Sequence, residues 1–126
     1  MKLSSISSVT CLVKDLQKTT EFYEALGFRI GKQEKSHVTC YVNWFSVDFI
    51  ADDQTSTPAQ QQEAQLANRG AGTYLHLKVE NADEFYEGVV AKGMTPDSTP
   101  EGKRSTGRSF ILRDPDGYKL VFFEKK

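Results

Sequence analysis

Two histidines are present in the 126-residue sequence, and one of them, His76, lies in a run of residues typical of a strand. His76 follows Tyr74 by two residues, so both side chains project from the same face of a strand. An imidazole there can bind a divalent metal, transfer a proton or contact an organic molecule. His37, Asp48 and Glu124 are further nitrogen and oxygen donors that could join His76 at a metal. A single strand histidine is more often a hydrogen-bonded wall residue than a metal ligand. We therefore favour contact of His76 with an organic molecule over metal binding.

The composition argues against several classes of protein. Sixteen basic and seventeen acidic residues give a net charge of −1, so the basic surplus of a dedicated nucleic-acid binder is missing. No apolar run approaches the roughly 20 residues that cross a bilayer, and the first residues have no apolar core of the secretory type. Cys11 and Cys40 do not make a disulfide framework. We expect a cytoplasmic protein without nucleic-acid or membrane partners.

The first part of the chain predicts a β-α-β-β-β module. Asp15 has the character of a helix N-cap, and Gly27 can end that helix in the left-handed conformation. Alternating or β-rich runs predict strands over residues 6–13, 28–33, 37–43 and 45–51. A polar stretch follows, in which Pro58 at a first helical position predicts a connecting helix over 58–69.

The same order of elements then returns. Residues 73–79 predict a strand, Asn81 begins a capping box, and Gly93 can end the second helix. The Asp114–Gly117 turn lies between two β-rich runs and predicts a closing hairpin, with the carboxylates of Asp114 and Asp116 in structural roles. We therefore predict one domain over residues 1–126. Its parts are module one at 4–52, a connecting helix at 53–70 and module two at 71–126.

The run from Val13 to Phe28 resembles the first-module signature of the vicinal oxygen chelate superfamily. This superfamily includes glyoxalase I, bleomycin-resistance proteins, extradiol dioxygenases and fosfomycin-resistance transferases. The second half adds similar segments at 72–79, 85–86, 91–93 and 114–117, so the resemblance covers nearly the whole chain. It implies an α+β fold in which two tandem β-α-β-β-β modules form a curved sheet around a ligand cleft, in a homodimer.

The resemblance also indicates where a metal would bind. Metal-dependent members project His or Glu side chains into the cleft, and three of the corresponding positions here hold Ser8, Tyr74 and Val121. Valine cannot coordinate a metal, and neutral hydroxyl groups bind one weakly. We therefore predict that the usual metal site and its divalent cofactor are absent. A displaced metal site near His76 is the alternative.

The same register predicts which side chains line the cleft. Cleft-facing positions on three strands are occupied by Ser8, Thr10, Tyr74, His76, Lys119, Val121 and Phe123. Two loop residues complete the predicted ligand-binding set. Trp44 stands in an aromatic cluster with Tyr41 and Phe45 that could serve core packing, dimer contact or stacking on a planar ligand. Arg108, like Arg104, borders a Gly/Pro-rich loop and could bind an anion or remain a solvated charge. No catalytic residue is identified.

Three functions remain open on these residues. The leading hypothesis is a metal-free protein that sequesters a small, partly planar molecule, as bleomycin-resistance proteins do with their drug. Bleomycin itself is cationic, whereas the predicted wall offers Lys119 and His76 rather than carboxylates. The alternatives are a glyoxalase-like lyase, dioxygenase or transferase with a metal near His76, and a catalytically silent subunit or regulator.

Overall fold

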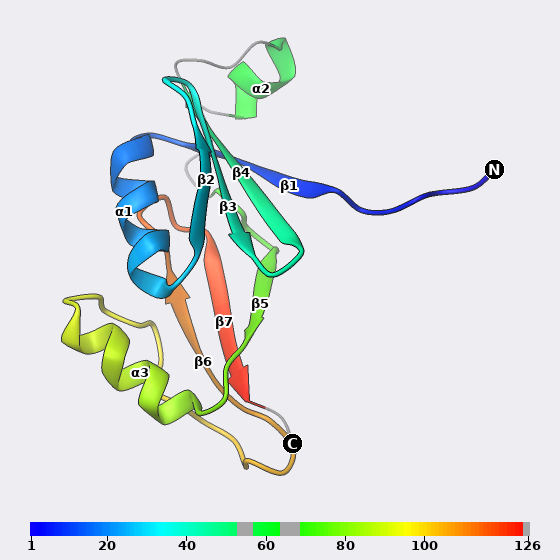
Figure 1. Cartoon of the computed structure of the whole chain (residues 1–126). Helices are drawn as coiled ribbons and strands as arrows, with labels where there is room; N and C mark the ends of the chain where they lie inside the picture. Colours follow the sequence, from blue (N-terminus) through cyan, green and yellow to red (C-terminus); the bar gives the residue numbers. More distant parts are fainter. Residues whose placement is uncertain (53–56, 64–68, 125–126) are drawn as a thin grey trace. The chain divides into compact units, whose positions relative to one another are not determined.

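A computed structural model describes residues 1–52, 57–63 and 69–124 of the chain. The chain divides into two compact units, residues 1–67 and residues 68–126, and each is described by itself. Figure 1 labels the helices and strands. Among the described residues, no helix has the length and apolar character needed to cross a membrane.

The first unit contains the predicted β-α-β-β-β order, followed by a short helix. Its elements are β1 (Ser8–Val13), α1 (Leu16–Leu26), β2 (Arg29–Gln33), β3 (His37–Val42), β4 (Phe45–Ala51) and α2 (Pro58–Glu63). The sheet has the strand order β1-β4-β3-β2, with β1 and β4 parallel and the other pairs antiparallel. The predicted connecting helix begins at Pro58 as expected, and residues 64–68 lie outside the described part of the chain.

Both predicted ends of α1 are confirmed. The Asp15 carboxylate accepts hydrogen bonds from the backbone N–H groups of Gln17 and Lys18 at 3.0 and 3.1 Å. These donors have no partner within a helix, so the cap stabilises the first turn. Gly27 adopts φ 106°, a left-handed conformation that a side chain would disfavour.

An aromatic cluster joins α1 to one face of the first sheet. The buried Tyr23 ring lies 4.6 Å from Phe49 of β4 and 5.0 Å from Phe28, measured between ring centroids. Val47 and Cys40, which are also buried, share the sheet face of Phe49. The core of the first unit therefore lies between α1 and the sheet face that carries Phe49.

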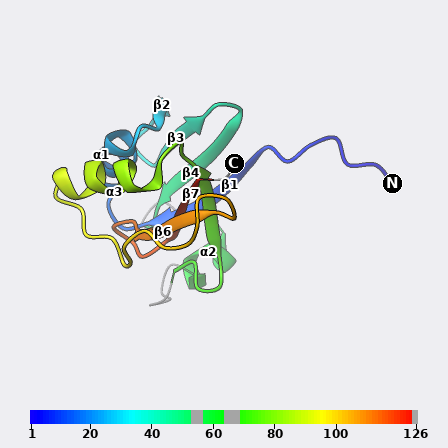
Figure 2. The same ribbon diagram turned by 90° about the horizontal axis from the view of Figure 1, so that it is seen from below.

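The second unit repeats the plan in a shorter form. Its elements are β5 (Tyr74–Lys78), α3 (Ala82–Ala91), β6 (Arg108–Arg113) and β7 (Lys119–Glu124). The strand order is β5-β7-β6, with β5 and β7 parallel and β6 and β7 antiparallel. In the view from below, α3 lies to one side of β6 (Figure 2). The α+β class with two related modules is thus confirmed.

One strand of the second module is reduced to an isolated bridge. The repeat predicts a strand before β6, but in the described part of the unit only Glu101 and Ser109 form a bridge pair there. The Ser98 hydroxyl accepts from Ile111 N at 3.1 Å, where a backbone carbonyl would accept in a regular ladder. Pro96 and Pro100 have no N–H group to donate. These two prolines explain why the segment follows β6 without forming a strand.

The predicted Asp114–Gly117 turn connects β6 to β7. The Asp114 carboxylate accepts from the N–H groups of Asp116 and Tyr118 at 2.8 and 3.0 Å, which confirms its structural role. Asp116 instead forms a buried ion pair with Arg69 at 3.3 Å. Both carboxylates therefore hold the turn that sets the register of the hairpin.

Candidate functional site

The sheet face opposite α1 in the first unit carries a connected group of polar side chains. We call this the first open face, and its central residues are Ser8, Thr10, His37, Thr39 and Asp48. Asp48 of β4 has Thr39 of β3 and Thr10 of β1 as its register partners, so the three residues share one face. Strand alternation places Ser8 and His37 on that same face.

Asp48 is the acceptor at the centre of this group. Its Oδ1 atom lies 2.6 Å from the Thr39 hydroxyl and 3.0 Å from His37 Nε2. Ser8 also donates to this carboxylate. Burial by itself raises the pKa of Asp48, but hydrogen bonds from Thr39, His37 and Ser8, with the charge of His37, lower that pKa from its ordinary value overall. Asp48 is therefore ionised at neutral pH and accepts every one of these bonds.

The sheet face opposite α3 in the second unit carries most of the predicted ligand-binding residues. We call this the second open face, and its residues are Tyr74, His76, Lys119, Val121 and Phe123. Tyr74 pairs with Lys119, and His76 pairs with Val121, so the strand register of this unit brings them onto one surface. Tyr74 is 50% exposed, and Val121 and Phe123 are half-buried.

Two ring contacts organise this second open face. The Lys119 ammonium group lies 5.0 Å from the centroid of the Tyr74 ring, within the range of a cation–π interaction. His76 and Phe123 meet in an edge arrangement with centroids 6.1 Å apart. The surface thus combines apolar rings with cationic or polar groups, the usual composition of a small-molecule contact surface.

Arg108 lies on the other side of the same sheet. Its register partner is Glu124, and both residues occupy the face covered by α3. Arg108 donates to both carboxylate oxygens of Asp83, at 2.8 and 2.9 Å. The structure therefore separates Arg108 from the other predicted ligand-binding residues of this unit, because strand alternation directs it toward the helix.

Glu124 cannot join His76 at a metal, which corrects the sequence-based hypothesis. The Glu124 carboxylate accepts from Ala82 N at 2.9 Å and from Arg104 at 2.6 Å. The hydrogen bond from Ala82 N, supported by Arg104, lowers the pKa of Glu124 despite the opposing effect of burial. Glu124 therefore anchors the start of α3, on the sheet face opposite His76.

The aromatic cluster near the β3–β4 turn is open to solvent. Trp44 is 99% exposed and lines a shallow hollow of about 400 Å³ together with Arg29, Tyr41 and Asn43. The guanidinium of Arg29 lies 5.4 Å from the centroid of the Tyr41 ring. Core packing within the chain is thus wrong for Trp44, whereas stacking on a ligand and contact with a second chain stay predictions.

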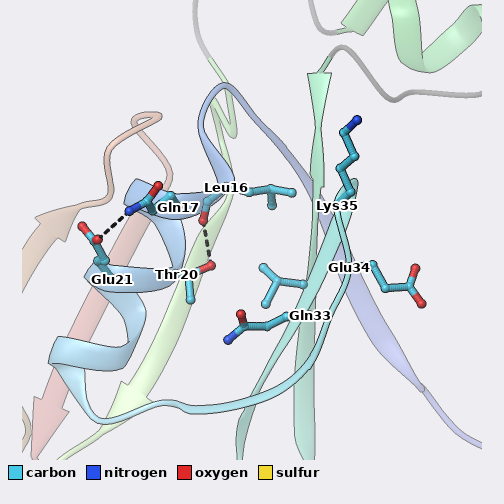
Figure 3. Close-up of a pocket in the computed structure, with 8 residues that line it drawn as sticks. Leu16, Gln17, Thr20, Glu21, Gln33, Glu34 and Lys35 are labelled. Carbon is cyan, nitrogen blue, oxygen red and sulfur yellow. Dashed lines mark hydrogen bonds between the residues drawn. The ribbon is translucent and has the colours of Figure 1, made fainter.

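A second hollow of about 230 Å³ lies beside the start of α1 (Figure 3). Thr20 donates to Leu16 O at 2.7 Å, and Gln17 donates to Glu21 at 3.3 Å, so these lining groups bond to one another. No residue of the predicted ligand-binding set lines this hollow. The full lining is Leu16, Gln17, Thr20, Glu21, Gln33, Glu34, Lys35 and Val38.

The two thiols are not assigned to a site. Cys40 is fully buried, and its pKa is raised to about 11 by burial and, secondarily, by the charge of Asp48. A thiol with this pKa remains protonated at neutral pH and is a poor nucleophile. Cys11 is half-buried and shares the α1-facing side of the sheet with Phe49.

The hydrogen-bonded pair of His37 and Asp48 is the site feature that sequence reasoning missed. The sequence indicates these two residues only as additional metal donors for His76. A signal for their contact existed, because a two-residue Asn43-Trp44 turn places Thr39 opposite Asp48 and His37 two residues further along. Ser8 carried no such signal, since its position beside Asp48 depends on the parallel pairing of β1 with β4.

Residues 5–122 match the profile of the family described as Glyoxalase/Bleomycin resistance protein/Dioxygenase superfamily. The chain has no match among curated protein sequences. Its fold is similar to that of the hypothetical protein SA1046 from S. aureus, with 22% identity, a TM-score of 0.78, and 98% of this chain and 95% of that chain covered.

Two further solved structures share the fold. A superfamily member from Sphaerobacter thermophilus is 22% identical, with a TM-score of 0.74 and 98% of both chains covered. A bleomycin-binding protein complexed with bleomycin is 20% identical, with a TM-score of 0.65, and 98% of this chain and 100% of that chain are covered. At these identities the similarity establishes a common fold.

Proposed function

The chain belongs to the Glyoxalase/Bleomycin resistance protein/Dioxygenase superfamily, and we propose that it binds a small planar molecule on the second open face. The observation that carries this proposal is the arrangement of Lys119 over the Tyr74 ring beside the His76–Phe123 ring pair. A planar ligand on this surface gains apolar contact with the rings and a charge interaction with the ammonium group. The proposed role is sequestration, for which the bleomycin-binding structure offers a precedent on the same fold.

The charges of the second open face favour a ligand with a negatively charged group. Strand alternation adds Lys78 and Arg113 to the face that holds Lys119. Arg113 is neutralised by an ion pair with Asp97. Lys78 and Lys119 therefore give the face a positive character, which complements an aromatic carboxylate or sulfonate and opposes a cationic drug.

The usual metal of the family does not fit the residues at the expected positions. Ser8 donates its hydroxyl to Asp48, Tyr74 offers a phenol, and Val121 has no donor atom. The structure shows no group of three or more His, Cys, Asp or Glu side chains able to hold a metal within the described ranges 1–52, 57–63 and 69–124. The proposed function accordingly contains no metal-dependent step.

Binding of a matched pair of fluorescent probes tests this proposal. Anilinonaphthalene sulfonate carries an anionic group, whereas N-phenyl-1-naphthylamine has the same ring system without it. We expect Lys119→Gln to weaken binding of the sulfonate about tenfold, or about 1.4 kcal/mol, and to leave the uncharged probe unaffected. Lys18→Gln, an exposed lysine on α1, is the control. Equal sulfonate binding by Lys119→Gln and the unaltered chain would remove the second open face from the proposal.

Metal content separates the proposal from the alternative of metal-assisted chemistry near His76. Purified untagged protein is analysed by elemental mass spectrometry after separate supplementation with Ni²⁺, Zn²⁺, Mn²⁺ and Fe²⁺. We expect none of these ions at a stoichiometric level. A near-stoichiometric ion that is lost in His76→Ala would reject the metal-free proposal and favour a lyase, dioxygenase or transferase.

A further inference from the structure

The hydrogen bonds around Asp48 determine which nitrogen of His37 carries a proton. An ionised carboxylate only accepts hydrogen bonds, so the nitrogen 3.0 Å from Asp48, Nε2, must be the donor. The Thr39 hydroxyl gives its proton to the same carboxylate oxygen at 2.6 Å, which leaves its own oxygen able to accept from Nε2 at 3.2 Å. All three contacts are satisfied when Nε2 is protonated.

The second nitrogen of the His37 ring is consequently left as an acceptor. In a neutral imidazole with a proton on Nε2, the Nδ1 atom has an unshared electron pair. Among the described residues, the His37 ring contacts Asp48 and Thr39, and both contacts involve Nε2 rather than Nδ1. The side chain of His37 is 30% exposed, so a small molecule can reach the ring.

We propose that His37 is a proton acceptor for the hydroxyl group of a phenol bound on the first open face, with Asp48 as its positioning residue. An aspartate that fixes the tautomer of a histidine and stabilises its protonated form is an established arrangement for acid–base chemistry. In the transfer step the ligand O–H bond breaks, the proton bonds to Nδ1, and the ligand becomes a phenolate. The charge of Asp48 offsets the imidazolium that forms.

The surroundings of His37 favour a ligand with an apolar ring. Ile50 is the register partner of His37, and Tyr41 lies four residues further along β3 on the same face. Both side chains are half-buried, and Ile50 offers apolar contact area on the strand next to His37. The Asp48 carboxylate lies 3.0 Å from the ring, and the Glu34 carboxylate, which precedes β3, is paired with Lys32.

The tautomer is tested by nitrogen NMR of the labelled full chain, because there are only two histidines to assign. His76→Gln identifies the His37 signals. We expect the neutral His37 ring to be protonated at Nε2, and we expect Asp48→Asn to shift the His37 signals while those of His76 stay in place. A His37 ring protonated at Nδ1, or one unaffected by Asp48→Asn, would overturn the proposal.

The acceptor role is tested with 4-nitrophenol and with 4-nitroanisole, which has a methyl ether in place of the hydroxyl group. We expect 4-nitrophenol to shift the Nδ1 signal of His37 and to show an increased phenolate absorbance, both of which His37→Gln abolishes and Lys18→Gln, at an exposed position of α1, retains. We expect 4-nitroanisole to leave Nδ1 unchanged. An equal response of Nδ1 to both probes, or a response to neither, would refute the role of His37 as a hydroxyl acceptor.

Discussion

The two open faces use their polar side chains in different ways. On the first open face, Thr39, His37 and Ser8 all donate to Asp48, so the polar groups hold one another in fixed positions. On the second, Lys119 and His76 contact aromatic rings. A face whose donors are already satisfied is suited to positioning one reactive nitrogen. A face of rings and cations is suited to contact area and charge attraction.

The largest expected effect distinguishes the two sides of β7. Phe122 is buried against the Phe85 and Phe110 rings, at centroid distances of 4.7 and 5.2 Å, whereas the adjacent Phe123 lies on the second open face. We expect Phe122→Ala to lower the free energy of unfolding by about 3–5 kcal/mol because it leaves a core cavity. Phe123→Ala is the matched control and should cost much less in urea unfolding. Equal losses would show that the second open face is also core.

Acid should destabilise both units through their hydrogen-bonded carboxylates. The pKa of Asp83 is lowered mainly by Arg108, and the pKa of Asp48 is lowered by its hydrogen bonds against the effect of burial. A lowered folded-state pKa contributes stability that is present above the ordinary carboxyl pKa and is lost as pH falls through the folded value. We expect melting temperatures to fall between about pH 5 and about pH 2.

Single substitutions test which carboxylate in each unit causes the loss of stability at low pH. Asp48→Asn and Asp83→Asn should each make the melting temperature less dependent on pH, measured by thermal melts across that range. Glu24→Gln on α1 is the control, and its profile should match that of the unaltered chain. A profile unchanged by both aspartate substitutions would contradict the assignment.

The local features of the fold could be predicted from the sequence, because each depends on residues close together in the chain. Asp15 caps α1 through the two residues that follow it, and Asp114 satisfies donors within its own turn. Binary alternation likewise predicted the surface shared by Tyr74 and His76. The absence of a regular strand in the segment before β6 has a local cause as well, because Pro96 and Pro100 have no N–H group to donate to a β-ladder.

Contacts that depend on pairing distant strands could not be predicted in the same way. The sequence predicts Arg108 as a loop residue, but the pairing of β6 with β7 places it opposite Glu124, on the α3 side. The bond from Ser8 to Asp48 requires the parallel register of β1 and β4, which no turn between them fixes. The sequence could therefore predict the surface that carries Tyr74 and His76. It could not predict the hydrogen-bonded group around Asp48.

A smaller expected effect tests how much the hydrogen bond from Thr39 to Asp48 contributes to the free energy of unfolding. Thr39→Val removes one hydroxyl from a buried position at nearly constant volume, so we expect the free energy of unfolding to fall by about 1 kcal/mol. Thr10→Val is the matched control, because Thr10 faces Asp48 from the other neighbouring strand and is exposed. Its effect should stay within about 0.5 kcal/mol in chemical denaturation. A Thr39→Val variant as stable as Thr10→Val would mean that the 2.6 Å bond contributes little.

The smallest expected effect on stability belongs to His76, and it is also the one that separates binding from folding on the second open face. His76 is exposed and touches Phe123 at its ring edge, so His76→Ala should change the free energy of unfolding by less than about 0.5 kcal/mol. The same substitution should weaken both naphthalene probes, since it removes a ring from the proposed contact surface. Fluorescence titration and urea unfolding of the same preparation measure the two quantities. Unaltered affinity for both probes would remove His76 from the binding surface, whereas a large loss of stability would show that its ring is a structural wall residue.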